Sequence, residues 1–223
     1  MRHPMLYLSI PTRNRVLQFA GRPPEADFLC ARERELKCIF FHLPKTGGLA
    51  ICEALFGGFH VNHRLYVKCA RQDPASLRRY WKFCVMREPI DRFLSAYHFL
   101  KAGGITEMDY RFRNQFAAAF ENIHTFVDAF HEQEVIRRFV HFRPQADFIC
   151  DSEGNPRMDF IGRFEQFEAS FQAITRHLGV SATLPVVNRG PSKGNEDLLS
   201  TDEEMFLRSF YEKDVKTLST VSF

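Results

Sequence analysis

The feature that most constrains the fold of this chain is an apolar run that ends in a proline, a lysine and two glycines. Residues 38–41 (Cys-Ile-Phe-Phe) have the length and apolar character of a buried strand, and residues 42–48 (His-Leu-Pro-Lys-Thr-Gly-Gly) follow directly. Glycines let the backbone approach an anion closely, N–H groups at a helix start point at it, and a lysine adds positive charge. The pattern predicts a strand, an anion-binding loop and a helix, in this order.

The order of residues in this loop differs from that of the common nucleotide-triphosphate loop. In that loop four residues separate the first glycine from a Gly-Lys-Ser/Thr sequence. Here Lys45 precedes both Gly47 and Gly48. The loop is therefore expected to hold its anion in a different way from an ordinary ATPase loop.

A second strand end carries another group that binds anions. Residues 81–86 form an apolar run that ends at Arg87, and Pro89 then occupies a position typical of the first turn of a helix. An arginine can donate two parallel hydrogen bonds to a phosphate, and the hydroxyl of Ser95 can add a third. Taken alone, Arg87 could equally pair with a neighbouring carboxylate, but together with the loop at Lys45 it fits a nucleotide with two separated charged groups.

Strands and helices alternate along the chain, which predicts an α/β fold with a parallel sheet covered by helices on both faces. In such sheets ligands bind at the carboxyl ends of the strands, where Lys45 and Arg87 both lie. The predicted strands are 37–42, 81–86 and 158–162, and the predicted helices are 46–55, 90–101, 116–131, 164–178 and 201–218. The last helix is expected to start at a capping box of Thr201 and Glu204.

Length and composition indicate one folded domain. We expect residues 1–34 to be an irregular leader and residues 35–223 to be a single domain. The 24 phenylalanines against one tryptophan predict an aromatic core, and a net charge of +3 is too small to indicate a nucleic-acid partner. The oligomeric state is not predicted.

The sequence also bears on location. No apolar run approaches the roughly 18–20 residues of a membrane span, and the first twenty residues lack the apolar centre of a signal peptide. The six cysteines are scattered without a Cys-x-x-Cys pair, which suggests neither a zinc site nor a disulfide framework. We therefore expect a cytoplasmic protein with reduced thiols and without a bound metal.

The two strand-end motifs together resemble a known pair. Residues 44–48, followed by residues 83–97, look like the paired signature of the sulfotransferases that use 3′-phosphoadenosine 5′-phosphosulfate (PAPS). The resemblance is closest to the carbohydrate branch, which includes heparan and chondroitin sulfotransferases and bacterial relatives. It continues in residues 143–145 and 159–165 and ends with Asn188 and Arg189, so that it covers about residues 37 to 218.

The resemblance implies a donor, a fold and a set of site residues. The donor would be PAPS, and the fold would be a three-layer, P-loop-NTPase-like sandwich with a central parallel sheet flanked by helices. Arg87 and Ser95 would hold the 3′-phosphate of the donor. Arg189, Ser192 and Lys193 match a loop that closes over the donor in relatives, although this stretch is equally readable as a solvated surface loop. The residues that would hold the 5′-phosphosulfate are Pro44, Lys45, Thr46, Gly47, Gly48 and Leu49.

Sulfuryl transfer needs charge stabilisation and a proton acceptor. Lys45 would neutralise the leaving phosphate, and a histidine near neutral pKa suits the role of general base toward an acceptor hydroxyl. Relatives place such a histidine after the first helix, where this chain has His60 and His63. His63 fits the spacing better, and Glu53 or His98 are further candidates, whereas His42 and His141 are expected to be structural.

The predicted activity is transfer of the sulfuryl group of PAPS to a hydroxyl, most plausibly on a carbohydrate. Residues 103–113 and 139–149 are the segments that we expect to contact this acceptor. Two alternatives remain open at this point. One is a small ATP-dependent phosphotransferase, for which the usual loop order is missing, and the other is a catalytically inactive nucleotide-binding relative.

Overall fold

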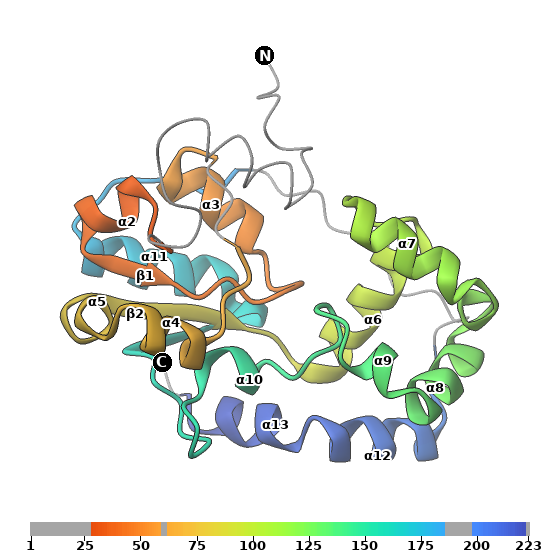
Figure 1. Cartoon of the computed structure of the whole chain (residues 1–223). Helices are drawn as coiled ribbons and strands as arrows, with labels where there is room; N and C mark the ends of the chain where they lie inside the picture. Colours follow the sequence, from red (N-terminus) through yellow and green to blue (C-terminus); the bar gives the residue numbers. More distant parts are fainter. Residues whose placement is uncertain (1–27, 59–61, 186–197, 222–223) are drawn as a thin grey trace.

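The computed structural model describes residues 28–58, 62–185 and 198–221, and within them a three-stranded parallel sheet forms the centre of the molecule (Figure 1). Its strands are β1 (Cys38–Phe40), β2 (Trp81–Met86) and β3 (Phe160–Arg163), and they lie side by side in this order. Both pairings are parallel, so the carboxyl ends of all three strands meet at one edge of the sheet. The predicted parallel sheet is confirmed.

One face of the sheet packs against helices α3 (Gly48–Phe56) and α11 (Phe167–Leu178). Successive side chains of a strand point to opposite faces, and here Phe40 and Phe83 stack on each other with ring centroids 5.0 Å apart. Both rings are fully buried. This face therefore forms a closed apolar core directly beneath the start of α3.

The other face is covered by four short helices. Ile39 and Cys84 point to this side, and their core includes residues of each covering helix. The sheet thus lies between two helical layers, as predicted for an α/β fold (Figure 1), while the finer P-loop-NTPase-like assignment stays a prediction. The covering helices are α4 (Tyr66–Gln72), α5 (Pro74–Arg79), α10 (Ala146–Ile149) and α13 (Glu212–Ser219).

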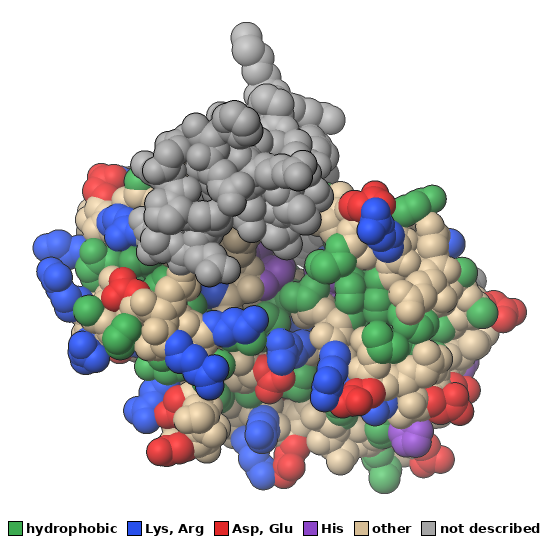
Figure 2. All heavy atoms as spheres, viewed as in Figure 1, with side chains coloured by type: hydrophobic (Ala, Val, Ile, Leu, Met, Phe, Trp, Pro, Cys, Tyr) green, Lys and Arg blue, Asp and Glu red, His purple; other side chains and the backbone are tan. Residues whose placement is uncertain are grey.

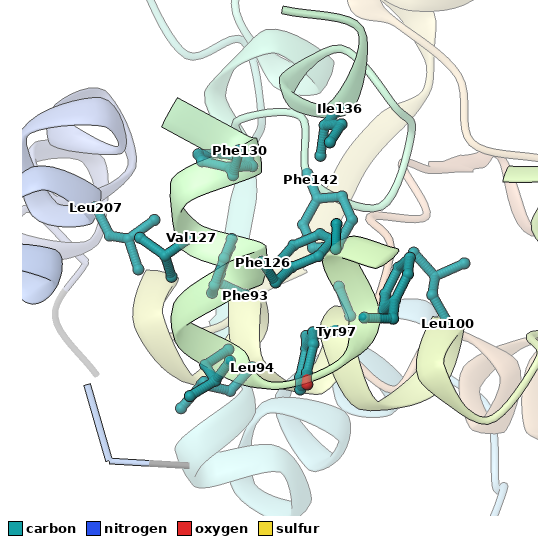
Figure 3. Close-up of a cluster of buried hydrophobic side chains, with 14 of the residues drawn as sticks. Phe93, Leu94, Tyr97, Leu100, Phe126, Val127, Phe130, Ile136, Phe142 and Leu207 are labelled. Atoms are coloured by element: carbon teal, nitrogen blue, oxygen red, sulfur yellow. The ribbon is translucent and has the colours of Figure 1, made fainter. Parts of the chain in front are cut away.

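A further group of helices packs together beside the sheet, around a core rich in phenylalanine (Figure 3). The ring of Phe142 lies 5.0 Å from that of Phe126 and 5.5 Å from that of Phe93, measured between centroids. The predicted aromatic core is confirmed. We call this part the helical lobe and the sheet with its covering helices the sheet lobe. The helical lobe contains α6 (Pro89–Lys101), α7 (Glu107–Gln115), the 3-10 helix η2 (Ala117–Phe120), α8 (Ile123–Glu132), α9 (Glu134–Arg137) and α12 (Thr201–Phe210).

A buried arginine ties the helices of this lobe to the chain that returns to the sheet. Arg92, on α6, is fully buried and donates hydrogen bonds to the carbonyl oxygens of His141 (2.8 Å) and Arg143 (2.9 Å). Each bond satisfies a backbone oxygen that would otherwise be buried without a partner. The position of His141 is therefore fixed through its backbone.

Two predicted helices are broken in the structure. The stretch 116–131 divides into η2 and α8, because Asn122 adopts an extended backbone and its side chain accepts a hydrogen bond from the Thr125 N–H. The last predicted helix divides at Tyr211 into α12 and α13. The hydroxyl of Tyr211 donates a hydrogen bond to the Phe142 carbonyl oxygen (2.6 Å). The predicted helix 164–178 begins instead with a 3-10 turn, η3 (Phe164–Gln166).

The predicted capping box of the last helix is wrong by one residue. Ser200, not Thr201, is the N-cap, and its partner is Glu203 rather than Glu204. The carboxylate of Glu203 also contacts Nδ1 of His124 at 2.8 Å, on α8. This contact between two helices favours the observed register over the other one.

The described part of the chain begins before the predicted domain start. Helix α2 (Ala31–Leu36) begins four residues ahead of residue 35, and Leu29 is already buried. Glu33 is fully buried, accepts the Phe40 N–H (3.0 Å) and pairs with Arg64 (3.1 Å). Residues 1–27 of the predicted leader lie outside the described residues. Among the helices that the structure describes, none is long and apolar enough to span a membrane.

Candidate functional site

The loop after β1 adopts a tight conformation with two left-handed residues. Lys45 has a φ of 66° and Gly47 a φ of 77°, and Gly47 is the N-cap of α3. A left-handed backbone is unusual for a residue other than glycine and persists where its surroundings hold it. Here the buried Thr46 hydroxyl donates to the Leu43 carbonyl oxygen (3.0 Å) and closes the turn. The loop therefore presents the start of a nine-residue helix at the carboxyl edge of the sheet.

Both glycines of this loop are required by close contacts. A Cβ atom at Gly48 would lie 1.9 Å from Cδ2 of His42, and one at Gly47 would lie 2.7 Å from the ring of Phe167. The backbone at the helix start is thus packed against side chains on one side. On its other side, the N–H groups and the positive end of the helix dipole are suited to binding an anion.

Lys45 is held in a partly apolar position. Its Nζ lies 3.8 Å from the centroid of the Phe99 ring, on α6. Burial and the nearby charge of Arg87 lower the pKa of Lys45 from 10.5 to about 8, while the charge of Asp109 acts in the opposite direction. A lysine in this state gains strongly from an incoming anion, because the anion restores the stability of its charged form.

Arg87 lies beside Lys45, as the sequence predicts. Its Nη1 is 3.4 Å from the Lys45 carbonyl oxygen, and its guanidinium lies 4.4 Å from the centroid of the Phe164 ring. Burial lowers the pKa of Arg87, and its Nε is buried without a hydrogen-bond partner among the described residues. A buried guanidinium N–H without a partner is costly, and an anionic ligand would satisfy it.

The backbone of Arg87 is clamped by a glutamine that the sequence analysis did not single out. Gln145 is fully buried; its Oε1 accepts the Arg87 N–H (2.9 Å), and its Nε2 donates to the Arg87 carbonyl (2.8 Å). The Gln145 backbone N–H in turn donates to the carboxylate of Asp214 (2.8 Å), on α13. Burial raises the pKa of Asp214. Helix α13 thus helps to set the position of Arg87.

The junction after β3 is held by contacts within the fold. A Cβ at Gly162 would lie 2.8 Å from Cβ of Ser170, so the strand and α11 approach closely there. Glu165 accepts the N–H of Glu88 (2.7 Å), and Arg163 donates to the Leu218 carbonyl. The first of these hydrogen bonds ties the start of α6 to the turn before α11, and the second ties β3 to α13.

His63 faces the loop, and its hydrogen bond defines its tautomer. Its Nδ1 lies 2.7 Å from the His42 carbonyl oxygen, which can only accept, so Nδ1 carries the proton. In the neutral ring Nε2 therefore keeps its lone pair and can accept a proton. The rings of His63 and His42 lie 4.4 Å apart between centroids.

His141 is buried and lies in the same cluster. Its Nε2 is 2.9 Å from Oδ1 of Asp109, and its ring is 6.2 Å from that of His63 between centroids. Asp109 belongs to this cluster, although the residues around it in the sequence do not indicate this. Its only local signal, a Thr106–Asp109 capping box, indicates a helix start and nothing more.

The other predicted site residues are placed less closely together. Pro44 is buried and Leu49 is about half exposed (47%), at the start of α3. Ser95 is half-buried on α6, and no hydrogen bond joins it to Arg87 within the described residues. The predicted residues His60, Arg189, Ser192 and Lys193 lie outside the described residues.

The predicted acceptor segments occupy two different environments. Gly103 and Gly104 form a helix terminus after α6, and the Gly104 N–H donates to the Phe99 carbonyl (2.9 Å). Residues 143, 144 and 147 line a cavity of about 730 Å³ with residues of α9 and with Phe210. Its charges are mixed, because arginines there pair with carboxylates, and Figure 2 shows the same mixture of signs over the face drawn.

Comparison with known proteins identifies the family. A model of the sulfotransferase family matches residues 59–222, about three quarters of the chain. The match includes His63, Arg87 and Ser95, and it begins after helix α3, so the loop at Lys45 precedes the matched residues. No curated protein and no solved structure gives a significant match. Because the family model covers well over half of its length, the chain belongs to the sulfotransferase family.

Proposed function

We propose that this protein transfers the sulfuryl group of PAPS to a hydroxyl group of a carbohydrate acceptor. The observation that carries the proposal is the approach of Arg87 to Lys45, 3.4 Å between Nη1 and the carbonyl oxygen, at the start of helix α3. Two cations and a helix N-terminus at one sheet edge suit a nucleotide with two separated anionic groups. Membership of the sulfotransferase family supports PAPS as that nucleotide.

The proposed donor site has two parts. The loop from Pro44 to Gly48, with Leu49, holds the 5′-phosphosulfate through its backbone N–H groups, that of Thr46 included, and through the Lys45 ammonium, while the Thr46 hydroxyl closes the turn. Arg87 holds the 3′-phosphate, and its unpartnered Nε supports this role. Ser95 assists Arg87. We assign Arg189, Ser192 and Lys193 to a loop that closes over the donor.

The proposed mechanism is an in-line transfer that relies on positioning and charge stabilisation. PAPS supplies the sulfuryl group and an anionic phosphate leaving group. Lys45 neutralises the negative charge that grows on the bridging oxygen as the S–O bond breaks, and the N–H groups of Gly47 and Gly48 support it. Nε2 of His63 accepts the hydroxyl proton while the hydroxyl oxygen bonds to sulfur. His60 is the alternative base.

The proposed setting is a reducing compartment such as the cytoplasm. All six cysteines are free thiols, and five of them are buried. Burial raises the pKa of Cys38 to about 12 and that of Cys69 to about 11, so these thiols stay protonated and unreactive. Such cysteines serve the core and need no oxidising environment.

The test is a thermal-shift titration of the full chain with 3′-phosphoadenosine 5′-phosphate (PAP), the donor product. Parallel titrations use ADP and ATP with magnesium. At about one hundred times its dissociation constant, a ligand adds roughly 2.7 kcal/mol of stability, or about 5–10 °C for a chain of this size. We expect this shift with PAP alone.

Matched variants show whether the shift comes from the proposed site. Arg87→Ala should abolish it, whereas Arg111→Ala should not, because Arg111 carries the same charge on the exposed surface of α7. A shift with ATP and magnesium instead would favour a phosphotransferase. No shift with any of the three would mean that the site binds none of these nucleotides, and either result would overturn the proposal.

A further inference from the structure

A buried carboxylate lies behind the proposed site. Asp109, in the first turn of α7, is 2% exposed. Its Oδ2 accepts the N–H groups of Ile105 (3.2 Å) and Thr106 (3.0 Å), and its Oδ1 is 2.9 Å from Nε2 of His141. All of these partners come from the helical lobe. The carboxylate is therefore held in one place.

The geometry defines the charge of this pair. Burial would raise the pKa of Asp109, but the hydrogen bonds from His141, Thr106 and Ile105 outweigh it and hold the pKa at about 2. Asp109 is thus ionised at neutral pH and can only accept hydrogen bonds. Nε2 of His141 must then carry a proton, and Nδ1 of this ring is buried without a partner among the described residues.

The pair is joined to the proposed site by packed rings. The ring of Phe99 lies 5.0 Å from that of His141 and 3.8 Å from Nζ of Lys45. On the other side, the rings of His141 and His63 are 6.2 Å apart. His141 therefore packs against His63 directly and against Lys45 through the ring of Phe99, and Asp109 is bonded to His141.

The charges around Lys45 are unbalanced without Asp109. Arg87, beyond β2, repels the Lys45 ammonium, and Asp109, on α7, attracts it. His63 and His141 are the other titratable groups of this cluster. When His63 takes up the hydroxyl proton, a further positive charge arises beside His141. In a site of low dielectric such charges need a nearby anion.

We propose that Asp109 is the counter-charge of the active site and that His141 is the positioning residue that holds it there. This inference rests on the proposed function. Asp109 exchanges no proton during turnover, because the hydroxyl proton goes to Nε2 of His63 as the new S–O bond forms and the bond to phosphate breaks. Its contribution is to keep Lys45 protonated and to stabilise the His63 imidazolium.

The experiment measures the pKa of Lys45 in the free, full-length protein. The extent of Lys45 acetylation by trace acetic anhydride is followed by mass spectrometry across pH 6–10 in the wild type and in Asp109→Asn. Loss of one buried negative charge should lower the pKa of Lys45 by about one unit, which makes the amine about fivefold more reactive at pH 7. An unchanged pKa would overturn the proposal.

Two controls separate this effect from a general change in charge or fold. Glu107→Gln removes the same charge from an exposed position on α7 (59% side-chain exposure) and should leave the pKa of Lys45 unchanged. His141→Gln keeps an amide donor near the position of Nε2 and should retain the wild-type value. His141→Leu removes that donor and should lower the pKa of Lys45. A wild-type pKa of Lys45 in this variant would contradict the role of His141.

The variants also keep the two proposals distinguishable. If Asp109→Asn does not fold, His141→Leu carries the test, because the capping box of α7 is left intact. The labelling needs neither PAPS nor an acceptor. If PAP causes no thermal shift but Asp109→Asn lowers the pKa of Lys45, the proposed function is overturned. If PAP causes the expected shift but Asp109→Asn leaves the pKa of Lys45 unchanged, only the counter-charge role of Asp109 is overturned.

Discussion

The two lobes contribute to the candidate site in different ways. The sheet lobe contributes a shaped backbone, formed by the left-handed residues Lys45 and Gly47 and the start of α3, together with the cationic side chains of Lys45 and Arg87. The helical lobe contributes side chains, Asp109 and His141, which are held by packing and hydrogen bonds. The sheet-lobe part depends on loop conformation and positive charge, and the helical-lobe part depends on packing and negative charge. Substitutions in the two lobes should therefore fail in different ways.

The largest effect is expected for Lys45→Ala in the sheet lobe. Removal of the ammonium that neutralises the leaving phosphate should lower turnover with PAPS about 10²- to 10³-fold. The measurement is PAP formation with the acceptor that the wild type uses best. Lys68→Ala, at an exposed position of α4, is the control and should keep full turnover. Equal turnover in Lys45→Ala and the wild type would exclude this role.

A comparable effect, but on stability, is expected for Phe126→Ala in the helical lobe. Phe126 is fully buried among Phe93, Tyr97 and Phe142 (Figure 3), and its loss should cost about 3–5 kcal/mol of unfolding free energy. Urea unfolding measures the cost, and Tyr110→Ala, at a position 56% exposed, is the control. The folded fraction should bind PAP normally. Weaker binding would mean that the lobes are not separable.

Gly48→Ala should weaken PAP binding by roughly 10- to 100-fold, since the new methyl would collide with the ring of His42 and shift the start of α3. Isothermal titration calorimetry gives the dissociation constant. Gly57→Ala is the matched control, because Gly57 has a φ of 61° and open space around its Cα. It should cost about 1 kcal/mol of stability and leave affinity unchanged. Equal affinity in both variants would argue against the loop as donor site.

The smallest effect is expected from pH. The Lys45 pKa of about 8 means that its ammonium is lost as the pH rises through 8, so PAP affinity should fall roughly tenfold between pH 7 and pH 9. Titration calorimetry across this range measures the change. Lys45→Arg keeps its charge at these pH values and should bind PAP almost independently of pH. A flat profile in the wild type would show that binding does not require the Lys45 ammonium.

The parts of the fold that the sequence predicts correctly are those coded by neighbouring residues. A short apolar run before a proline and two glycines is a local pattern, and so is Arg87 before a proline. Because parallel strands bring their carboxyl ends to one edge, the approach of Lys45 and Arg87 follows from these patterns. The carbohydrate acceptor and the roles of the site residues stay predictions.

The parts that could not be predicted depend on contacts between distant segments. Residues 200–204 (Ser-Thr-Asp-Glu-Glu) contain two overlapping capping boxes, and the contact of Glu203 with His124 favours one of them. The pairing of Asp109 with His141 joins two segments that are 32 residues apart. The residues around Asp109 carry no information about those around His141, so the pair is seen only in the packed helical lobe.

The amide of Gln145 has a consequence for how the protein is made. It pairs with both the N–H and the carbonyl of Arg87, as a neighbouring strand would, and it is itself held by Asp214 of α13. During synthesis the three strands can associate before α13 is made, but the Gln145 backbone N–H gains its Asp214 partner only when that helix docks. Full nucleotide affinity should therefore arise only after α13 has docked.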